Sequence, residues 1–473
     1  MGDEITSRFF EGEDFSRFRE LLDQETALLQ QVFQDQGFST RGDVAGFELE
    51  AWLVDKHGLP RPDNDAFLQQ LASPLVVPEL AKFNIELNGS PSSLTGRVFT
   101  RLHDELSATW QQCKKTADAQ DLQVVAIGTL PSATPELFVA ENMSGMVRYK
   151  SLNDRVMALR DGRALEIELE GNAPLHLSHS DVMLEAAATS FQIHLQCHAD
   201  SAVQDFNASL ATTAPLVAVS ANAPYLFGHE VWDESRIPLF EQSVDVGERN
   251  DPRVFFGSGY VTESLFEIFA ENCRQGILIP MVHDKPAHEF RHVRFQNGTL
   301  WRWVRPLIGF DFDGQVHLRI EQRVPSAGPT IVDCIANAAF YYGMVRGLRA
   351  NPGALTEILT FDLAKQNFYA AARYGLGARI AWPKNGKLDE WAMRDLVMQE
   401  LLPLARQGLA TLEIPNDEID RYLDVIAART DNSQNGAAWQ RRFVSQTNAT
   451  MPELVNRYVE LQQADQPVHT WPL

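Results

Sequence analysis

Two pairs of glutamates within residues 41–91 lie among apolar residues, and they limit the fold more than any other feature of the chain. The pairs are Glu48 and Glu50 in GFELEAWLV, and Glu79 and Glu86 in PELAKFNIELN. Alternate residues of an extended strand point to the same face, so Glu48 and Glu50 should lie side by side. Carboxylates this close repel each other unless a cation lies between them, and oxygen ligands suit magnesium or manganese. For Glu48 and Glu50 alone, an edge strand with a solvated acidic face is the alternative.

Composition excludes several classes of partner. The chain has 473 residues, 44% of them hydrophobic, and its 63 acidic and 41 basic residues give a net charge of −22. Such an excess of negative charge argues against nucleic acid and anionic membranes as general partners, although a bound metal still allows an anionic small substrate.

The sequence carries no sign of export or membrane insertion. Its four cysteines lack CxxC spacing, which favours a reduced compartment. The first residues, MGDEITSRFFEGEDF, have no apolar core of the kind that a secretory signal needs. Since no apolar run approaches the roughly 18 residues of a membrane helix, we expect a soluble cytoplasmic protein.

Hydrophobic periodicity predicts a mixed α and β chain up to about residue 328 and a helical region after it. In ALEIELEG the glutamates Glu166, Glu168 and Glu170 alternate with apolar residues, as on the solvated face of a hairpin. Helices are expected over 14–35, 97–119, 141–160 and 201–219, and strands over 45–54, 83–88, 164–171 and 191–198. Three further strand-like runs, HEFRHVRF, TLWRWVRPLIGF and VHLRIEQRV, predict an antiparallel meander within 286–323. Helices should then follow over most of 329–473, including DEWAMRDLVMQELLPLARQGLATL.

The strand FQIHLQCH has an unusual polar face. Gln192, His194, Gln196 and His198 point one way in an extended strand, opposite an apolar face. This pattern is typical of a lined cavity, while a purely structural histidine is the alternative. In RIEQR, the same periodicity places Glu321 beside Arg323.

Residues 288–292 spell HExxH, the pattern in which one helix offers two histidines to zinc and a glutamate to water. Here Pro286 precedes the motif and Asn297-Gly298 follows it, and the alternation between them favours a strand. In a strand, Glu289 would point away from the two histidines. A zinc metallopeptidase is therefore an alternative that the local sequence does not favour.

Seven short motifs between about residues 42 and 380 resemble, in order and spacing, the glutamate–cysteine ligase type 2 family of carboxylate–amine ligases. They are GFELEAW, ELAKFNIELN, FQIHLQ, ESR at 234–236, TLWRWVRP, RIEQR and NFYAAARYGL. The resemblance implies an α+β, glutamine-synthetase-like fold, in which a curved antiparallel sheet flanked by helices forms an active-site funnel. It also implies ATP-dependent activation of a carboxylate as an acyl phosphate, followed by attack of an amine, with glutamate–cysteine ligation in glutathione biosynthesis as one candidate activity.

The resemblance also assigns roles to individual residues. Glu50, Glu79 and Glu86 correspond to the ligands of one magnesium or manganese ion, and Glu48, His194 and Glu321 to those of the ion nearer the transferred phosphoryl group, with two or three ions in all. Arg323 and Arg236, with Glu321, correspond to catalytic residues. Arg305 is a further candidate for binding an anion such as ATP. Gln192, Thr299 and Arg373 are weaker candidates, and a structural ion pair is the alternative for Arg373.

These observations predict one catalytic domain over residues 1–473, with an N-terminal helical segment (1–40), a sheet-rich core (41–328) and a helical region packed on it (329–473). Expected partners are a small amino acid and an amine, with a homo-oligomer left open. A noncatalytic protein that binds ATP and an amino acid on the same fold is the main alternative function.

Overall fold

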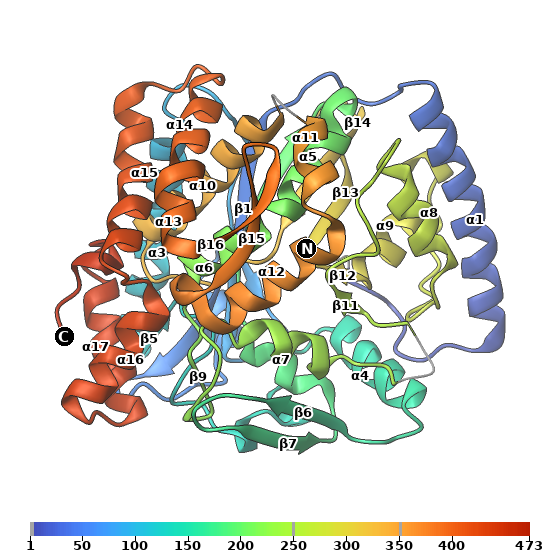
Figure 1. Cartoon of the computed structure of the whole chain (residues 1–473). Coiled ribbons are helices and arrows are strands. Elements are labelled where there is room, and N and C mark those ends of the chain that lie inside the picture. The colour runs from blue at the N-terminus through green and yellow to red at the C-terminus, as the bar shows by residue number, and fades with distance from the viewer. Residues whose placement is uncertain (1–3, 248–250, 350–351) are drawn as a thin grey trace.

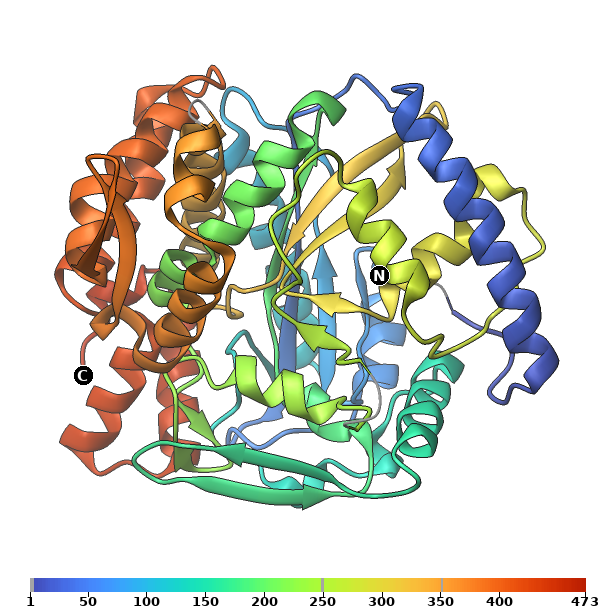
Figure 2. The same cartoon turned by 45° about the vertical axis from the view of Figure 1, so that its right-hand side comes forward.

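A computed structural model describes residues 4–247, 251–349 and 352–473, and its centre is a curved, eight-stranded antiparallel sheet (Figures 1 and 2). Six strands follow one another in the order β13-β14-β8-β1-β3-β2, and β4 and β5 pair with β1. The strands are β1 (Val44–Asp55), β2 (Val76–Pro78), β3 (Asn84–Asn88), β4 (Ser92–Ser93), β5 (Leu122–Val125), β8 (Phe191–Cys197), β13 (Val304–Phe310) and β14 (Val316–Gln322). The expected mixed fold around an antiparallel sheet is confirmed.

The register of the sheet brings its polar residues into adjacent rungs. Glu50 of β1 lies opposite Glu86 of β3, and Glu48 lies opposite Gln192 of β8. In turn, His194 of β8 lies opposite Glu321 of β14. Side chains on one face of neighbouring strands are in contact range, so pairing alone gathers residues that are up to 273 positions apart.

Helices cover both sides of the sheet. On one side α1 (Gly12–Gln34) packs against α8 (Phe266–Arg274) and α9 (Arg291–Gly298), at the right of Figure 1. On the other side lies the larger helical layer, drawn mostly in orange and red. It comprises α3 (Val98–Asp118), α5 (Ala202–Ala211), α6 (Thr213–Ser220), α10 (Ile331–Arg349), α12 (Phe361–Tyr374), α14 (Leu402–Ala410), α15 (Asn416–Asp431), α16 (Gly436–Thr447) and α17 (Met451–Gln462).

The helix α10 is the core of this layer. Every residue from Ile331 to Arg346 is buried, as expected for a helix that is apolar on all sides. Glycine allows its close approach to α14, because a Cβ added to Gly343 would lie 2.6 Å from the carbonyl oxygen of Ala405.

Smaller elements complete the rim of the sheet. The hairpin of β6 (Leu165–Leu169) and β7 (Leu175–His179) lies at the bottom of Figure 1, near α4 (Val147–Leu159) and α7 (Arg236–Ser243). Its Glu166 and Glu168 are exposed, which confirms the predicted solvated face. The remaining elements are α2 (Asn64–Leu71), β9 (Tyr225–Leu226), β10 (His229–Glu230), β11 (Val254–Phe255), β12 (Trp301–Arg302), α11 (Pro352–Ile358), β15 (Arg379–Lys384), β16 (Lys387–Ala392), α13 (Met393–Leu396) and the short helical turns η1–η8.

The strand predicted for HEFRHVRF is wrong. This segment forms the 3-10 turn η5 (Ala287–Glu289) and the helix α9, separated by Phe290 at φ 50°. The carboxylate of Glu25 in α1 accepts hydrogen bonds from the backbone N–H groups of His292 and Val293, at 2.7 and 3.0 Å. An acidic group at a helix N-terminus satisfies otherwise free N–H groups, so a partner 267 residues away overrides the local alternation.

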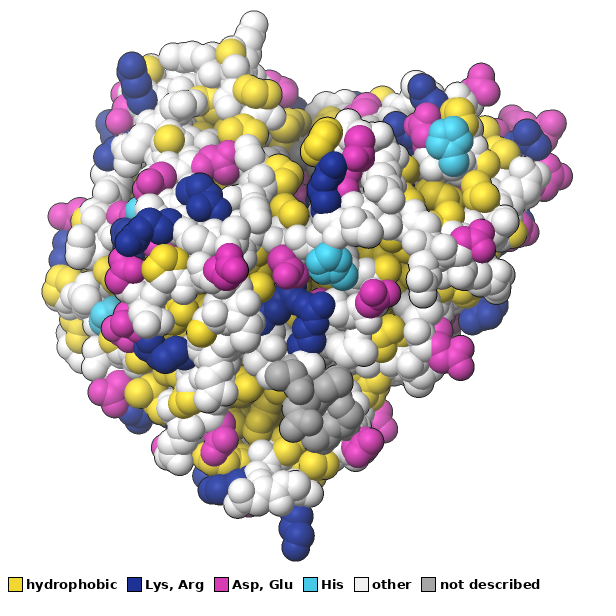
Figure 3. All heavy atoms as spheres, turned by 90° about the horizontal axis from the view of Figure 1, so that it is seen from above, with side chains coloured by type: hydrophobic (Ala, Val, Ile, Leu, Met, Phe, Trp, Pro, Cys, Tyr) yellow, Lys and Arg dark blue, Asp and Glu magenta, His cyan; other side chains and the backbone are white. Residues whose placement is uncertain are grey.

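The predicted C-terminal helices also begin differently. DEWA belongs to β16, which pairs with β15 in a hairpin, and helical structure starts at Met393. Within the described residues no helix is both long and apolar enough to cross a membrane. On the face seen in Figure 3, acidic and basic side chains are interspersed.

Candidate active site

A cavity of about 260 Å³ lies against the polar face of the sheet. Its walls come from β1, β3, β8, β13 and β14 on the sheet, and from α4, α9 and the short turn η3 (Val182–Ala187) around it. The charged residues of its lining are Glu48, Glu50, Glu79, Glu86, Arg148, Glu185, Arg291, Arg294, Arg305, Arg319, Glu321 and Arg323. Carboxylates and guanidinium groups thus share one cavity.

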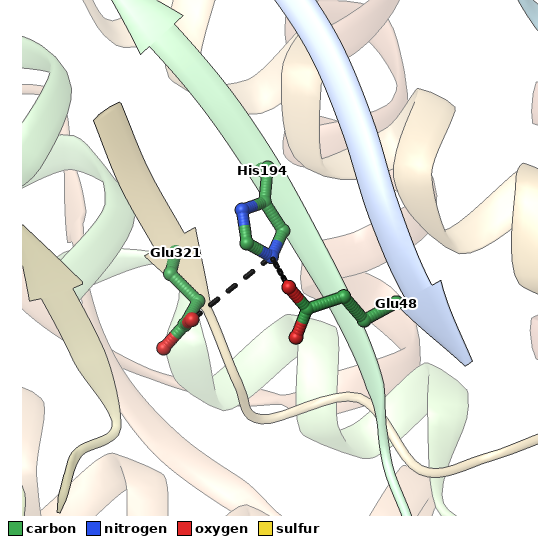
Figure 4. A group of neighbouring side chains, drawn as sticks. All are labelled: Glu48, His194 and Glu321. Atoms are coloured by element: carbon green, nitrogen blue, oxygen red, sulfur yellow. Dashed lines mark ion pairs between the residues drawn. The ribbon is translucent and has the colours of Figure 1, made fainter. Parts of the chain in front are cut away.

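Glu48, His194 and Glu321 converge at one point, each from a different strand (Figure 4). One ligand atom of each lies within 4.8 Å of the others, and all three residues are buried. His194 Nε2 lies 3.4 Å from Glu48 Oε1 and 4.0 Å from Glu321 Oε1. One imidazole and two carboxylates form a donor set that suits a divalent cation.

The state of His194 agrees with such a role. Neither of its ring nitrogens has a hydrogen-bond partner among the described residues, although the residue is only 4% exposed. Burial, and then the charge of Arg319, lower its pKa to about 4. The ring is therefore neutral near pH 7, which is the form that binds a metal.

Glu50, Glu79 and Glu86 form a second acidic group in the same cavity. Burial raises the pKa of Glu50 to about 7, assisted by the charge of Glu86, and burial with the charge of Glu50 raises the pKa of Glu79 to about 7. The pKa of Glu86 lies well above its ordinary value, because of burial and then the charges of Glu48 and Glu79. A cation would remove this repulsion. Within the described chain, these three residues do not bring their oxygens as close together as the first group does.

A continuous chain of hydrogen bonds connects the two groups. Glu50 Oε1 accepts from Gln192 Nε2 at 3.0 Å, and Gln192 Oε1 accepts from Arg323 Nη1 at 2.6 Å. Arg323 Nη1 also donates to Glu321 Oε2 at 3.0 Å, and Arg305 donates to both oxygens of Glu321. The predicted neighbours Glu321 and Arg323 are thus in direct contact.

The other predicted residues take different positions. Thr299 lines the cavity, and its hydroxyl donates to the carbonyl oxygen of Gln296. Arg236 is buried behind the lining, where it pairs with Glu234 at 3.0 Å and donates to the carbonyl oxygens of residues 323 and 324. Arg373 forms an ion pair at 2.7 Å with the exposed Glu170. The structure therefore brings Thr299 to the cavity, places Arg236 as a support for Arg323, and leaves Arg373 outside the lining.

Sequence reasoning missed part of the lining. Glu185, Arg148 and Arg294 face the cavity but lie outside the seven family motifs, and Arg319, which also faces it, lies in RIEQR without an assigned role. One signal was available for Glu185, which is the only charged residue in the apolar run VMLEAA.

The HExxH residues lie apart from each other. His288 is exposed in η5, whereas His292 is buried in α9 with its Nδ1 2.7 Å from Glu25 Oε1. The αL residue Phe290 separates them, so they do not share the helical face that a zinc peptidase needs.

Known proteins resemble this chain in sequence and in fold. A sequence model of the glutamate–cysteine ligase family 2 matches residues 44–461. The fold is similar to that of a glutamate–cysteine ligase from Francisella tularensis in complex with AMP, with a TM-score of 0.57 and 13% identity over 92% of this chain and 90% of that one. A bifunctional glutathione synthetase from Pasteurella multocida aligns with a TM-score of 0.48 and 13% identity over 94% of this chain and 54% of that one. No curated protein sequence matches the chain. The expected fold class is confirmed.

Proposed function

The chain belongs to the glutamate–cysteine ligase family 2, a family of carboxylate–amine ligases, and we propose that it joins an amino-acid carboxylate to an amine with ATP through an acyl phosphate. Glutamate, activated at its γ-carboxylate, is the first candidate for the acid, and cysteine for the amine. The product would then be a γ-glutamyl peptide. A cytoplasmic location and a single catalytic domain over residues 1–473 are part of the proposal.

The proposed reaction has two steps. A carboxylate oxygen first attacks the γ-phosphorus of ATP, so that an O–P bond forms and the bond to ADP breaks. After the ammonium form of the amine has lost one proton, its nitrogen lone pair attacks the acyl carbon. The C–N bond forms, phosphate leaves with the electron pair of the C–O bond, and the nitrogen loses a second proton. One carboxylate, one ATP and one ammonium group therefore give an amide, ADP, phosphate and a proton.

The residues of the cavity suit this chemistry because phosphoryl transfer depends mainly on position and on neutralised charge. Glu48, His194 and Glu321 would hold one magnesium or manganese ion, and Glu50, Glu79 and Glu86 a second. Ions bound there would neutralise the phosphates and orient the γ-phosphoryl group for in-line transfer.

The arginines of the cavity would also act on the γ-phosphoryl group of ATP. Arg323 faces the cavity beside Glu321, where it can stabilise the negative charge that builds up on the transferred phosphoryl group. Arg305 orients Glu321, Gln192 links Arg323 to Glu50, and Arg236 supports the backbone that carries Arg323. Thr299 and Arg305 remain candidates for contact with ATP. Arg373 would stabilise the surface instead.

The observation that carries the proposal is the convergence of Glu48, Glu321 and an imidazole whose nitrogens have no hydrogen-bond partner among the described residues. Such a buried set is costly unless a cation completes it.

The test is release of phosphate from ATP by the purified protein with magnesium, when amino acids and amines are offered singly and in pairs. We expect release only when one acid and one amine are present together, and none when EDTA removes the metal. No release with any pair, together with a higher melting temperature in magnesium and ATP, would instead support the noncatalytic binding protein.

A further inference from the structure

Glu185 is a carboxylate of the cavity that the proposed mechanism does not use. It lies in η3, whose other five residues, Val182, Met183, Leu184, Ala186 and Ala187, are buried. Glu185 alone is partly accessible, and it lines the cavity. The turn packs against α4 and α7, so Glu185 enters from outside the sheet that carries most of the other acidic residues.

The carboxylate of Glu185 is not paired with a cation in the part of the chain that the structure describes. Within the described chain, no hydrogen bond or ion pair reaches its carboxylate. Arg323 is close enough to lower its pKa, but burial and then the charge of Glu50 outweigh this effect and raise the pKa to about 8. Arg323 itself donates to Glu321 and Gln192. A cation that arrives with a ligand would stabilise the charged form of such a buried carboxylate.

Glu185 shares its cavity with Arg323, which would hold the transferred phosphoryl group. A ligand group beside both residues would therefore lie next to the acyl phosphate. The acceptor amine must reach this place, and at neutral pH it arrives mainly as ammonium, because even the terminal α-amino group of a peptide has a pKa of about 7.7–8.0.

We propose that the carboxylate of Glu185 binds the ammonium group of the acceptor amine and positions its nitrogen beside the acyl phosphate. This inference rests on the proposed ligase function and adds a specificity-determining residue to it. It makes Glu185 a selector for cationic acceptors, with no part in the activation of the acid by ATP.

The test compares a charged acceptor with an uncharged one in the variant Glu185→Gln. Hydroxylamine is a weak base that is mostly neutral at pH 7, and it traps an acyl phosphate as a hydroxamate. With L-glutamate, magnesium and ATP, the reference acceptor is L-cysteine or the amine that the phosphate-release panel identifies. Because one charge-assisted hydrogen bond is lost, we expect kcat/KM for this amine to fall about 10- to 100-fold, mainly through KM. Hydroxamate formation and the KM values for ATP and glutamate should stay close to those of the unchanged protein.

Two further variants complete the test. Glu185→Asp keeps the charge and should retain part of the amine activity. Glu166→Gln makes the same chemical change on the exposed face of β6 and should alter neither acceptor reaction.

The outcomes separate this inference from the proposed function. Unchanged amine kcat/KM in an active Glu185→Gln protein would overturn the role of Glu185 alone. Equal losses with amine and hydroxylamine, with a higher magnesium requirement, would overturn it too and identify Glu185 as a metal ligand. If the unchanged protein releases no phosphate with any pair and forms no hydroxamate, the ligase function itself fails.

Discussion

Arg305 holds both carboxylate oxygens of Glu321, with Nε 2.8 Å from Oε2 and Nη2 3.0 Å from Oε1. The two residues are direct partners in the register of β13 and β14. A bidentate pair fixes the plane of a carboxylate, and here it holds Glu321 Oε1 at 4.0 Å from His194 Nε2. Arg305 therefore prepares the orientation of a proposed metal ligand.

Replacing Arg305 should show whether a metal can substitute for it. In EDTA we expect Arg305→Ala to lower the free energy of unfolding by about 3–5 kcal/mol, because Glu321 is left buried beside fewer cations. Magnesium should recover part of this loss. Urea unfolding in both conditions measures it, with Arg17→Ala as the control. Arg17 pairs with Glu20 on the surface, a contact worth about 1 kcal/mol or less. An equal loss of unfolding free energy with and without magnesium would show that a metal does not substitute for Arg305 beside Glu321.

Glu48 offers a direct test of the first metal group. Glutamine keeps its shape but removes the charge, so Glu48→Gln should reduce phosphate release by at least about 100-fold while the melting temperature in EDTA changes little. Glu321→Gln should also abolish turnover, although its two arginine contacts add a cost in stability. Glu166→Gln is the exposed control. Turnover at the unchanged rate in Glu48→Gln would mean that the metal ligands are misassigned.

The sequence predicted the parts of this site that depend on strand periodicity. The alternation around Glu48, His194 and Glu321 places each on the polar face of its strand, and the register of the sheet brings the three together. Periodicity alone does not predict which strands pair with each other in the sheet. The convergence itself came from resemblance to a family and became visible only in three dimensions.

The other differences between the sequence analysis and the structure have physical causes outside the local sequence. The segment of α9 alternates like a strand, but its N-terminus is completed by Glu25 from α1. Arg373 lies in a motif, yet its partner Glu170 is on the β6 side of the molecule and exposed. Glu185 reaches the cavity because η3 packs on α4 and α7. A tertiary contact of this kind has no signature in a local sequence motif.

The buried carboxylates predict how stability depends on pH. The pKa of Glu50 and of Glu79 is raised to about 7, and that of Glu185 to about 8, in each case by burial and then by a neighbouring carboxylate. An unfolded glutamate has a pKa of about 4.3. At these three carboxyls the folded metal-free protein therefore holds protons that the unfolded chain has released, so their contribution makes stability fall as pH rises from about 4.3 to about 8. It outweighs the opposite contribution of the histidine His194, whose pKa is lowered to about 4.

Magnesium should reverse this trend because it competes with those protons. Each fully shifted group costs up to about 1.4 kcal/mol per pH unit in the metal-free protein. We expect the melting temperature in EDTA to fall between about pH 5 and pH 8, and the increase caused by magnesium to grow over the same interval. Differential scanning calorimetry measures both. The same increase at either end would show that magnesium does not bind these carboxylates.

Substitution of Arg236 should lower stability and turnover strongly, whereas substitution of Arg373 should change both little. Arg236 is 3% exposed and uses three nitrogens, with Nε on Glu234 and the other two on the carbonyl oxygens of residues 323 and 324. The single ammonium nitrogen of lysine cannot make these three hydrogen bonds at once in the planar geometry of a guanidinium. Arg236→Lys should therefore cost about 1.5–3 kcal/mol for each charged bond lost, and it should slow turnover because Arg323 loses its support.

Arg373→Ala breaks a pair with Glu170, whose side chain is 75% exposed, so stability should change by about 1 kcal/mol or less and KM for ATP should stay the same. Urea unfolding and steady-state kinetics test both variants. A raised KM for ATP in Arg373→Ala would return Arg373 to the binding site, and normal turnover in Arg236→Lys would show that the position of Arg323 does not depend on this support.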